Sequence, residues 1–488
     1  MAIRIFAITL GIPQILPELG WFLVVERMDE GFSLYSEIWD DISPLSSYFY
    51  WLIYRLFGTE SLAIQIITTL LILLQAFMLN HFLRRRDIFL DRTQVPILLY
   101  LTLTNLFIDY YTLSPVLLAN TFLIITIRYI FLHINERKKY NAVFEIGAYI
   151  GLATLFYLPS FLMLLVPLVV FILYTGTALK DYLLMLFAFL FTIGIAFLGF
   201  YLNNSEYDFY LNFFQSLFYL KPHFYVSFVD LIKLMALPIL FTLLGIFNTH
   251  LYRRYTNYQH RSQFVMTFWL IISFLTMFIS SKISSYSFIL VIPAIVFILS
   301  HYLLMLRNTF YKEAIYMLIL LSSLYFLFST LYKTPLKINI PIASWTRFEI
   351  SVSTDKLLVK PHPKSDLIRG KRILVLGNAL GNYQGARVAS PYLNWRLAQR
   401  HIDNIDRYFN IKTRVYSNIF DNPQKDIPEI IVDVDGTAPV LFRHLPLAAQ
   451  QYEKIPNTQP VLYARKDKQT SEDTLKTTKK SQRRASRE

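Results

Sequence analysis

Residues 60–82 read ESLAIQIITTLLILLQAFMLNHF, an apolar stretch whose one carboxylate, Glu60, stands at its first position. A helix of about 20 such residues is long enough to cross a hydrocarbon core about 30 Å thick. Comparable runs recur up to residue 332, so the sequence predicts an all-α polytopic membrane bundle over residues 1–332. The eleven expected spans are 3–25, 60–82, 94–112, 114–133, 143–158, 160–178, 182–202, 229–249, 263–280, 285–304 and 313–332.

The composition of the whole chain agrees with a membrane protein. Of its 488 residues, 55% are hydrophobic and 16% are charged, whereas soluble domains are about 25% charged. The composition therefore argues against a water-soluble globular enzyme. Because the sequence contains no cysteine, it also excludes disulfides, thiolate metal sites and a cysteine nucleophile.

The net charge of +14 is concentrated in part at the C-terminal end of the chain. Residues 465–488 hold nine Lys or Arg and four acids, a surplus of five positive charges. This stretch is polar and lacks aromatic residues, so residues 466–488 are predicted to be a basic disordered tail, and no nucleic-acid partner is expected. Contact of the tail with anionic lipid headgroups is the alternative.

Lys and Arg are unevenly divided between the two sets of alternate loops. One set carries thirteen, whereas the other carries four, namely Arg27, Arg55, Lys221 and Lys282. Positive loops stay on the cytoplasmic side, so we expect the N-terminus inside and residues beyond 332 outside. Abundant Phe, Tyr, Ile and Lys favour the cytoplasmic membrane of a bacterium.

The sequence pattern of residues 333–465 predicts a small extracytoplasmic α/β domain. Strands are expected at 372–376, 411–417 and 429–434, and helices at 392–409 and near 444–453. Gly377 and Gly381 lack the GxGxxG spacing of a dinucleotide site, so they are interpreted as turn residues.

The first outer loop, residues 26–58, begins with six acids: Glu26, Asp29, Glu30, Glu37, Asp40 and Asp41. A carboxylate at the membrane surface can act as a general base toward a hydroxyl group or hold a divalent cation. A solvated acidic loop without chemistry is the alternative. The aromatic stretch 48–54 is expected to lie in the membrane interface.

The first outer loop contains MDEGFSLYSEI at 28–38, followed by Pro44-Leu45 and Leu56-Phe57-Gly58. This segment and two later ones resemble the GT-C glycosyltransferases, in particular the branch of the dolichyl-phosphate-mannose protein mannosyltransferases and the bacterial lipid A aminoarabinose transferase. The second is SSKISSYSFILVIPA at 280–294, similar to a family segment in which a Lys precedes a Tyr and a Leu-rich helix with Pro. The third is Asp109 in FIDYY, where family members carry a second acid. The extra pair Asp40-Asp41 departs from the family pattern.

The resemblance implies a sugar donor carried on polyprenyl phosphate and an acceptor glycan, lipid or protein at the outer face of the membrane. It implies catalytic roles for Asp29, Glu30 and Asp109, with Asp29 as general base or as ligand of a divalent cation. The substrate-binding residues that it implies are Tyr35, Asp40, Asp41, Lys221, His223, Lys282 and Tyr286, of which the cationic ones neutralise the departing phosphate.

Other interpretations compete with this one. Lys282 and His223 also suit ordinary interfacial positions, and Asp109 also suits a helix end. The main alternative function is a catalytically inactive GT-C-like scaffold of a surface or secretion assembly. Glu18, a carboxylate inside the first predicted span, leaves a transporter as a third function.

Overall fold

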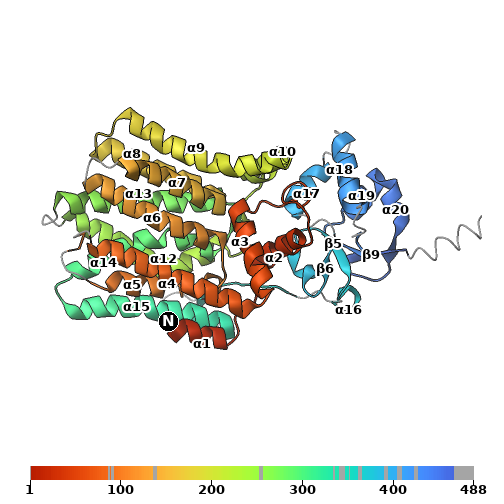
Figure 1. Cartoon of the computed structure of the whole chain (residues 1–488). Coiled ribbons are helices and arrows are strands. Elements are labelled where there is room, and N and C mark those ends of the chain that lie inside the picture. The colour runs from red at the N-terminus through yellow and green to blue at the C-terminus, as the bar shows by residue number, and fades with distance from the viewer. Residues whose placement is uncertain are drawn as a thin grey trace, which may run out of the picture. The chain divides into compact units, whose positions relative to one another are not determined.

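A computed structural model of the chain describes residues 2–85, 88–89, 93–135, 140–251, 256–332, 336–339, 347–350, 352–360, 365–389, 394–403, 409–421 and 427–466 (Figure 1). The chain forms two compact units. The membrane unit comprises Met1–Phe22 and Ile42–Leu358, and the C-terminal unit comprises Leu23–Asp41 and Val359–Glu488. The tail predicted at 466–488 lies, from residue 467 on, outside the described residues.

Six helices of the membrane unit are, within the described residues, long and apolar enough to cross a membrane. They are α4 (Ser61–Arg85), α6 (Pro115–Asn135), α9 (Leu179–Leu202), α12 (Phe228–Leu251), α13 (Asn257–Ile279) and α15 (Thr309–Tyr332), and each coincides with a predicted span. Shorter apolar helices occupy three further predicted spans: α7 (Tyr140–Phe156), α8 (Leu165–Tyr174) with the preceding 3-10 helix Leu158–Leu164, and α14 (Ile292–Met305). The predicted fold class is confirmed, whereas the number of eleven spans is not.

The span predicted at 3–25 is two helices, α1 (Ala2–Thr9) and α2 (Leu16–Asp29). Gly11 between them has φ = 83°, a left-handed conformation that a helix cannot continue through, and Pro13 follows it. With eight residues, α1 is about 12 Å long. It is therefore too short to cross the hydrocarbon core, and the expectation of one crossing helix at 3–25 is wrong.

The span predicted at 94–112 is also interrupted. Helix α5 ends at Leu103 after beginning at Val95, and a separate 3-10 helix, Ile108–Tyr111, follows. The carbonyl groups of Thr104 and Tyr110 accept hydrogen bonds from the side chain of Arg4 at 3.0 and 2.9 Å. The chain between α5 and α6 is therefore a turn ordered around a buried arginine.

Helix α3 (Pro44–Phe57) has two faces of different exposure. Tyr48, Leu52 and Leu56 recur every four residues and are 50%, 50% and 64% exposed, whereas Tyr50 and Ile53 are buried. Such a helix, apolar on its exposed side, has the pattern of one that lies in a membrane interface.

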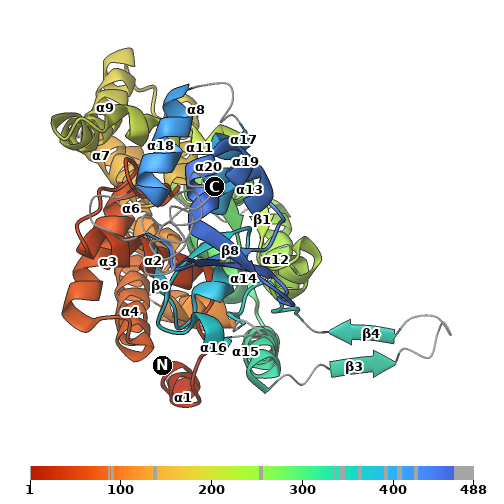
Figure 2. The same cartoon turned by 90° about the vertical axis from the view of Figure 1, so that its right-hand side faces the viewer.

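Small elements connect the membrane helices α9, α12, α13 and α14. The loop after α9 contains α10 (Glu206–Phe209), a π-helical turn (Tyr210–Phe214), α11 (Ser216–Tyr219) and the strand β1 (His223–Phe224). The loop after α13 contains the strand β2 (Lys282–Ile283) and the 3-10 helix η4 (Ser285–Leu290). After α15, the strands β3 (Leu336–Asn339) and β4 (Arg347–Ile350) form an antiparallel hairpin (Figure 2).

The C-terminal unit contains a five-stranded sheet in the order β6-β5-β7-β9-β8. The strands are β5 (Arg372–Leu376), β6 (Arg387–Val388), β7 (Ile430–Asp433), β8 (Tyr452–Ile455) and β9 (Val461–Arg465). Strand β5 is parallel to β6 and β7, and β9 is antiparallel to β7 and β8. The helices of the C-terminal unit after residue 359 are α16 (Ser365–Ile368), α17 (Trp395–Asp403), α18 (Phe409–Phe420), α19 (Ala438–His444) and α20 (Pro446–Gln451).

The strands expected at 372–376 and 429–434 are confirmed as β5 and β7, but the strand expected at 411–417 is wrong. That segment lies in α18, which buries Val415 and Ile419 four residues apart. Gly377 after β5 is a turn residue with φ = 135°, and a Cβ atom there would lie 2.6 Å from the Cβ atom of Val434.

Helices α7 and α9 approach closely through two glycines. A Cβ atom on Gly147 would lie 2.1 Å from the carbonyl oxygen of Met185, and one on Gly151 would lie 2.8 Å from the Cβ atom of Thr192. Small residues are what allow membrane helices to pack at such short range.

We predict that Gly147→Val lowers the melting temperature of the detergent-solubilised protein by several degrees, because α7 and α9 must separate to accommodate the side chain. Overpacking of this kind costs about 1–3 kcal/mol. Gly194→Ala on α9 is the control, since its Cβ atom would meet no atom within 4 Å. Equal melting temperatures for Gly147→Val and the unmodified protein would contradict the packing described here.

Candidate functional site

Asp109 connects the turn before α6 to the start of η4. Its carboxylate is fully buried, and Oδ2 accepts hydrogen bonds from the hydroxyl groups of Ser284 and Ser285, both at 2.7 Å, and from the amide of Tyr286 at 3.0 Å. Oδ1 has no hydrogen-bond partner among the described residues. Asp109 thus fixes the segment that directly follows Lys282.

The strands β1 and β2 bring two of the predicted cationic residues side by side. The two strands pair in parallel, with His223 opposite Lys282. The amide of His223 donates to the carbonyl group of Ser281 and the amide of Tyr225 donates to that of Ile283, both at 2.9 Å. Lys221, two residues before His223, is exposed. Two loops that are separated by α12 and α13 are therefore held in one short ladder.

Aromatic rings surround Tyr286, which is buried. The ring of Trp21 meets that of Tyr286 edge to face at 5.9 Å and stacks on Tyr50 at 5.6 Å. The hydroxyl group of Tyr50 donates to the carbonyl group of Leu113. Glu18 lies buried one turn before Trp21 in α2. The start of α2 is thereby packed against α3 and η4.

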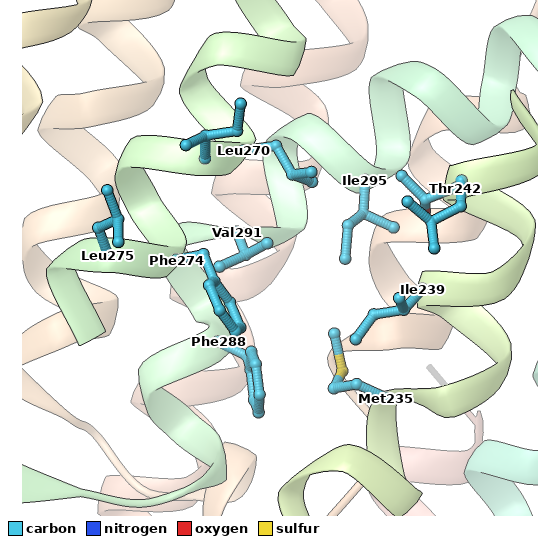
Figure 3. A pocket seen from close by; sticks show the side chains of 11 residues that line it. Met235, Ile239, Thr242, Leu270, Phe274, Leu275, Phe288, Val291 and Ile295 are labelled. Carbon is cyan, nitrogen blue, oxygen red and sulfur yellow. The ribbon is translucent and has the colours of Figure 1, made fainter. Parts of the chain in front are cut away.

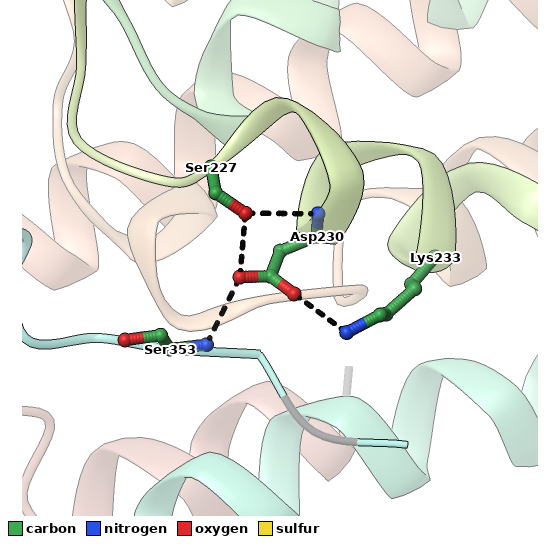
Figure 4. A network of polar contacts seen from close by, with 4 residues as sticks. All are labelled: Ser227, Asp230, Lys233 and Ser353. Carbon is green, nitrogen blue, oxygen red and sulfur yellow. Dashed lines mark hydrogen bonds and ion pairs between the residues drawn. The ribbon is translucent and has the colours of Figure 1, made fainter. Parts of the chain in front are cut away.

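The N-terminal end of α12 is held by Asp230, a buried carboxylate (Figure 4). Oδ2 accepts from the hydroxyl group of Ser227 at 2.8 Å and from the amide of Ser353 at 3.4 Å, and Oδ1 accepts from Lys233 at 2.9 Å. Ser353 belongs to the segment that follows the β3–β4 hairpin. This segment also contacts the start of α2, because the amide of Leu16 donates to the carbonyl group of Leu357 at 2.7 Å and Ile15 pairs with Leu358 in an isolated β-bridge.

An apolar cavity of about 270 Å³ lies between α12, α13 and the η4–α14 segment (Figure 3). Apart from Thr242, its lining side chains are apolar: Met235, Ile239, Leu243, Leu270, Ile271, Phe274, Leu275, Phe288, Val291 and Ile295. Phe288 is two residues after Tyr286, so one wall of the cavity begins next to the segment that Asp109 binds.

Asp29 and Glu30 lie in the C-terminal unit, at the end of α2. Asp29 is exposed at the last position of the helix, and Glu30 forms an ion pair with Arg27. The buried guanidinium group of Arg27 also lies 5.3 Å from the ring centroid of Phe32. Burial raises the pKa of Tyr383 to about 12, and the charge of Arg27 acts against this rise.

Residues 31–38 form a compact turn. Tyr35 is fully buried with φ = 70°, a left-handed conformation that is uncommon outside glycine. Its amide donates to the carbonyl group of Ile38 at 3.0 Å, and the amide of Ser33 donates to the carboxylate of Glu37 at 2.7 Å. These bonds fix the backbone that follows Asp29.

Asp40 and Asp41 bind Asn394, the residue before α17. The side-chain amide of Asn394 donates to both carboxylates at 3.1 Å, and its backbone amide donates to the carbonyl group of Trp39 at 2.8 Å. Trp39 is 1% exposed and belongs to the buried cluster that also contains Leu376 and Trp395. The end of the acidic loop is therefore part of the C-terminal unit's core.

The structure gathers the predicted site residues into two groups. Asp109, Lys221, His223, Lys282 and Tyr286 lie in the membrane unit, and Asp29, Glu30, Tyr35, Asp40 and Asp41 lie in the C-terminal unit. That Asp29 and Lys282 act in one site stays a prediction. Among the described residues, no three His, Asp or Glu side chains are grouped to hold a metal ion.

Sequence reasoning missed Arg4, Trp39 and Asn394. Arg4 is the one charged residue in the apolar segment 2–17, and such a charge usually marks a buried polar contact. Trp39 follows Ile38 and precedes two acids, and this pattern gives no sign of a contact more than 300 residues away.

Comparisons with known proteins address the fold. No protein-family model matches the chain, and no curated protein matches its sequence. ArnT from Cupriavidus metallidurans bound to undecaprenyl phosphate is 12% identical, with a TM-score of 0.54 over 95% of this chain and 96% of that one. The chain has a GT-C-like fold.

Two further structures are similar to this GT-C-like chain. ArnT from the same organism in the apo state is 15% identical, with a TM-score of 0.49, and the match covers 70% of this chain and 65% of that one. The apo oligosaccharyltransferase of Archaeoglobus fulgidus is 12% identical, with a TM-score of 0.45 over 94% of this chain and 71% of that one.

We predict that Trp39→Ala destabilises the C-terminal unit by about 3–5 kcal/mol, the usual cost of removing a buried aromatic side chain. The measurement is limited proteolysis of the full chain across a urea series, with cleavage assigned to residues 359–466. Trp51→Ala on α3, where Trp51 is only half-buried, is the control. Unchanged protection in Trp39→Ala would exclude Trp39 from the core of the unit.

Proposed function

We propose that this chain is a membrane glycosyltransferase that moves a sugar from a polyprenyl-phosphate donor to an acceptor at the outer face of a bacterial cytoplasmic membrane. The observation that carries the proposal is the near full-length fold match to ArnT, a protein solved with undecaprenyl phosphate bound. The ladder that pairs His223 with Lys282 supports it, because Lys282 stands six residues before Phe288, which lines the apolar cavity.

The apolar cavity suits part of a prenyl chain. Its lining is almost entirely hydrocarbon, and it adjoins η4, whose first residues follow Lys282. A phosphate headgroup near Lys282, His223 and Lys221 would then leave the prenyl chain between α12, α13 and α14. Charge-assisted hydrogen bonds to a phosphate are stronger than neutral ones, and this favours a lysine in that place.

The proposed reaction has three balanced parts. The acceptor hydroxyl oxygen attacks the anomeric carbon of the donor sugar, and the bond from that carbon to the phosphate oxygen breaks. Asp29 takes the proton of the hydroxyl group as general base. The polyprenyl phosphate leaves as an anion, which Lys282, His223 and Lys221 stabilise. No step is assigned to a metal ion.

Glu30 and Asp109 have supporting roles in this proposal. The ion pair of Glu30 with the buried Arg27 restrains the turn next to Asp29. Asp109 holds the start of η4 through Oδ2. Its second oxygen, which has no partner among the described residues, is the atom that we propose for contact with the acceptor.

We predict that Asp29→Asn abolishes sugar transfer without lowering the amount of protein in the membrane, because the amide cannot accept the proton. The measurement is mass spectrometry of surface glycans and lipid-linked sugars in a deletion strain that carries each variant. Asp366→Asn, which alters another exposed carboxylate of the C-terminal unit, is the matched control.

The deletion and Asp29→Asn should both lose one sugar and accumulate its polyprenyl carrier, whereas Asp366→Asn should restore the sugar. Full restoration by Asp29→Asn would refute the catalytic proposal and favour a scaffold. A transport defect that depends on Glu18 and not on Asp29 would favour a transporter.

We also predict that Ile239→Trp weakens binding of undecaprenyl phosphate to the purified protein about tenfold, because the larger ring occupies the cavity and about two CH₂ groups lose their burial. Leu240→Trp is the control, since Leu240 is the next residue on α12 and is 49% exposed. Native mass spectrometry over a lipid titration measures both. Equal affinities for the two variants would exclude this cavity as the lipid site.

A further inference from the structure

Arg4 is a buried cation in the first helix of the membrane unit. Its side chain is fully buried and donates to the hydroxyl group of Thr69 at 3.2 Å and to the carbonyl groups of Thr104 and Tyr110 at 3.0 and 2.9 Å. Its guanidinium carbon lies 4.1 Å from the ring centroid of Tyr111. Burying a charge is costly unless it is paired or hydrogen-bonded, and here each of the three guanidinium nitrogens donates a hydrogen bond.

The two carbonyl groups lie near the two ends of the turn between α5 and α6: Thr104 directly follows α5, and Tyr110 lies in the 3-10 helix Ile108–Tyr111. Because a guanidinium group is a planar fork, its bonds to Thr104 and Tyr110 set the separation of those ends. A second tie crosses the same turn, since the hydroxyl group of Tyr111 donates to the side chain of Asn105 at 2.9 Å. In the sequence, Asp109 lies between Thr104 and Tyr110, whose carbonyl groups Arg4 binds.

Asp109 carries this restraint to the other loop. It binds Ser284, Ser285 and the amide of Tyr286 through Oδ2. Lys282 stands two residues before Ser284 and pairs with His223. Hydrogen bonds and short backbone segments of the membrane unit therefore connect Arg4 to Lys282, and Asp109 lies in the middle of this connection.

We propose that Arg4 is a positioning residue: it fixes the turn that carries Asp109 and thereby the place of Lys282 and His223. The part that concerns phosphate rests on the proposed function, whereas the link from Arg4 to Ser284–Tyr286 does not. A residue that only attached α1 to the bundle would leave the 284–290 segment unchanged when it was replaced.

The first test is hydrogen–deuterium exchange of the full chain in detergent. Arg4→Lys keeps the charge but loses the fork, so exchange should rise about tenfold in peptides covering 104–112 and 284–290, the change expected for loss of one hydrogen bond to a charged group. Arg128→Lys is the control, because Arg128 also faces a tyrosine ring but is exposed. Exchange that rises at 104–112 alone would overturn the proposal.

The second test is a double-mutant cycle on binding of undecaprenyl phosphate. Arg4→Lys and Asp109→Asn should each weaken binding about tenfold, and the double variant should be no weaker than either single one, because both changes act on the same link. Binding of undecaprenol, which has no phosphate, should be unaffected. Effects that multiply would show that Arg4 acts independently of Asp109 and would overturn the proposal.

A negative result in the binding test does not decide the outcome of the exchange test. If the unmodified chain does not bind undecaprenyl phosphate, the proposed function is wrong, while the exchange measurement still decides whether Arg4 holds the 284–290 segment. If Arg4→Lys does not accumulate, Thr69→Val replaces it, because this change removes the acceptor of the Nε hydrogen bond of Arg4 and leaves the bond from Tyr111 to Asn105 in place, so exchange should again rise in both segments.

Discussion

The buried carboxylate of Asp109 is the constraint on which the arrangement of the membrane unit's loops depends. It accepts three hydrogen bonds from one short segment, so the start of η4 has one position relative to the turn before α6. An unpaired buried polar group costs about 1–3 kcal/mol, so the three bonds to Oδ2 offset part of the cost of burying this carboxylate. The β1–β2 ladder and the cavity wall formed by Phe288 both follow from that position.

Each of the two units is stabilised by a different kind of contact. Inside the membrane unit, Arg4, Asp109 and Asp230 form hydrogen bonds mainly with backbone groups and serine or threonine hydroxyls, and Asp230 also pairs with Lys233. In the C-terminal unit, a hydrophobic core that includes Trp39 and Trp395 is the main source of stability, and Asn394 binds two acids at its edge. The first arrangement suits a surrounding without water, and the second suits a small α/β unit.

Much of the fold was predictable from the sequence, because a membrane demands long apolar helices and each helix satisfies its own backbone. The breaks in the helices were harder to predict. Gly11 and Pro13 are local signals, but the turn after Leu103 depends on Arg4, which is about 100 residues away. Segment 411–417 was misassigned because Ile411, Thr413 and Val415 alternate like a strand, although Val415 and Ile419 also have helical spacing. The sequence likewise indicated Asp109, Lys282 and His223, but not which residues bind them.

The contribution of Trp39 to the C-terminal core has a consequence for biogenesis. The core is built from a loop made early in synthesis and from residues 374–452, which leave the ribosome more than 300 residues later. The loop must therefore persist without its partners while all the membrane helices insert. A truncated chain that ends within the bundle would lack the residues of the C-terminal unit that cover Trp39, so a stop at any point before that unit leaves this loop without its core.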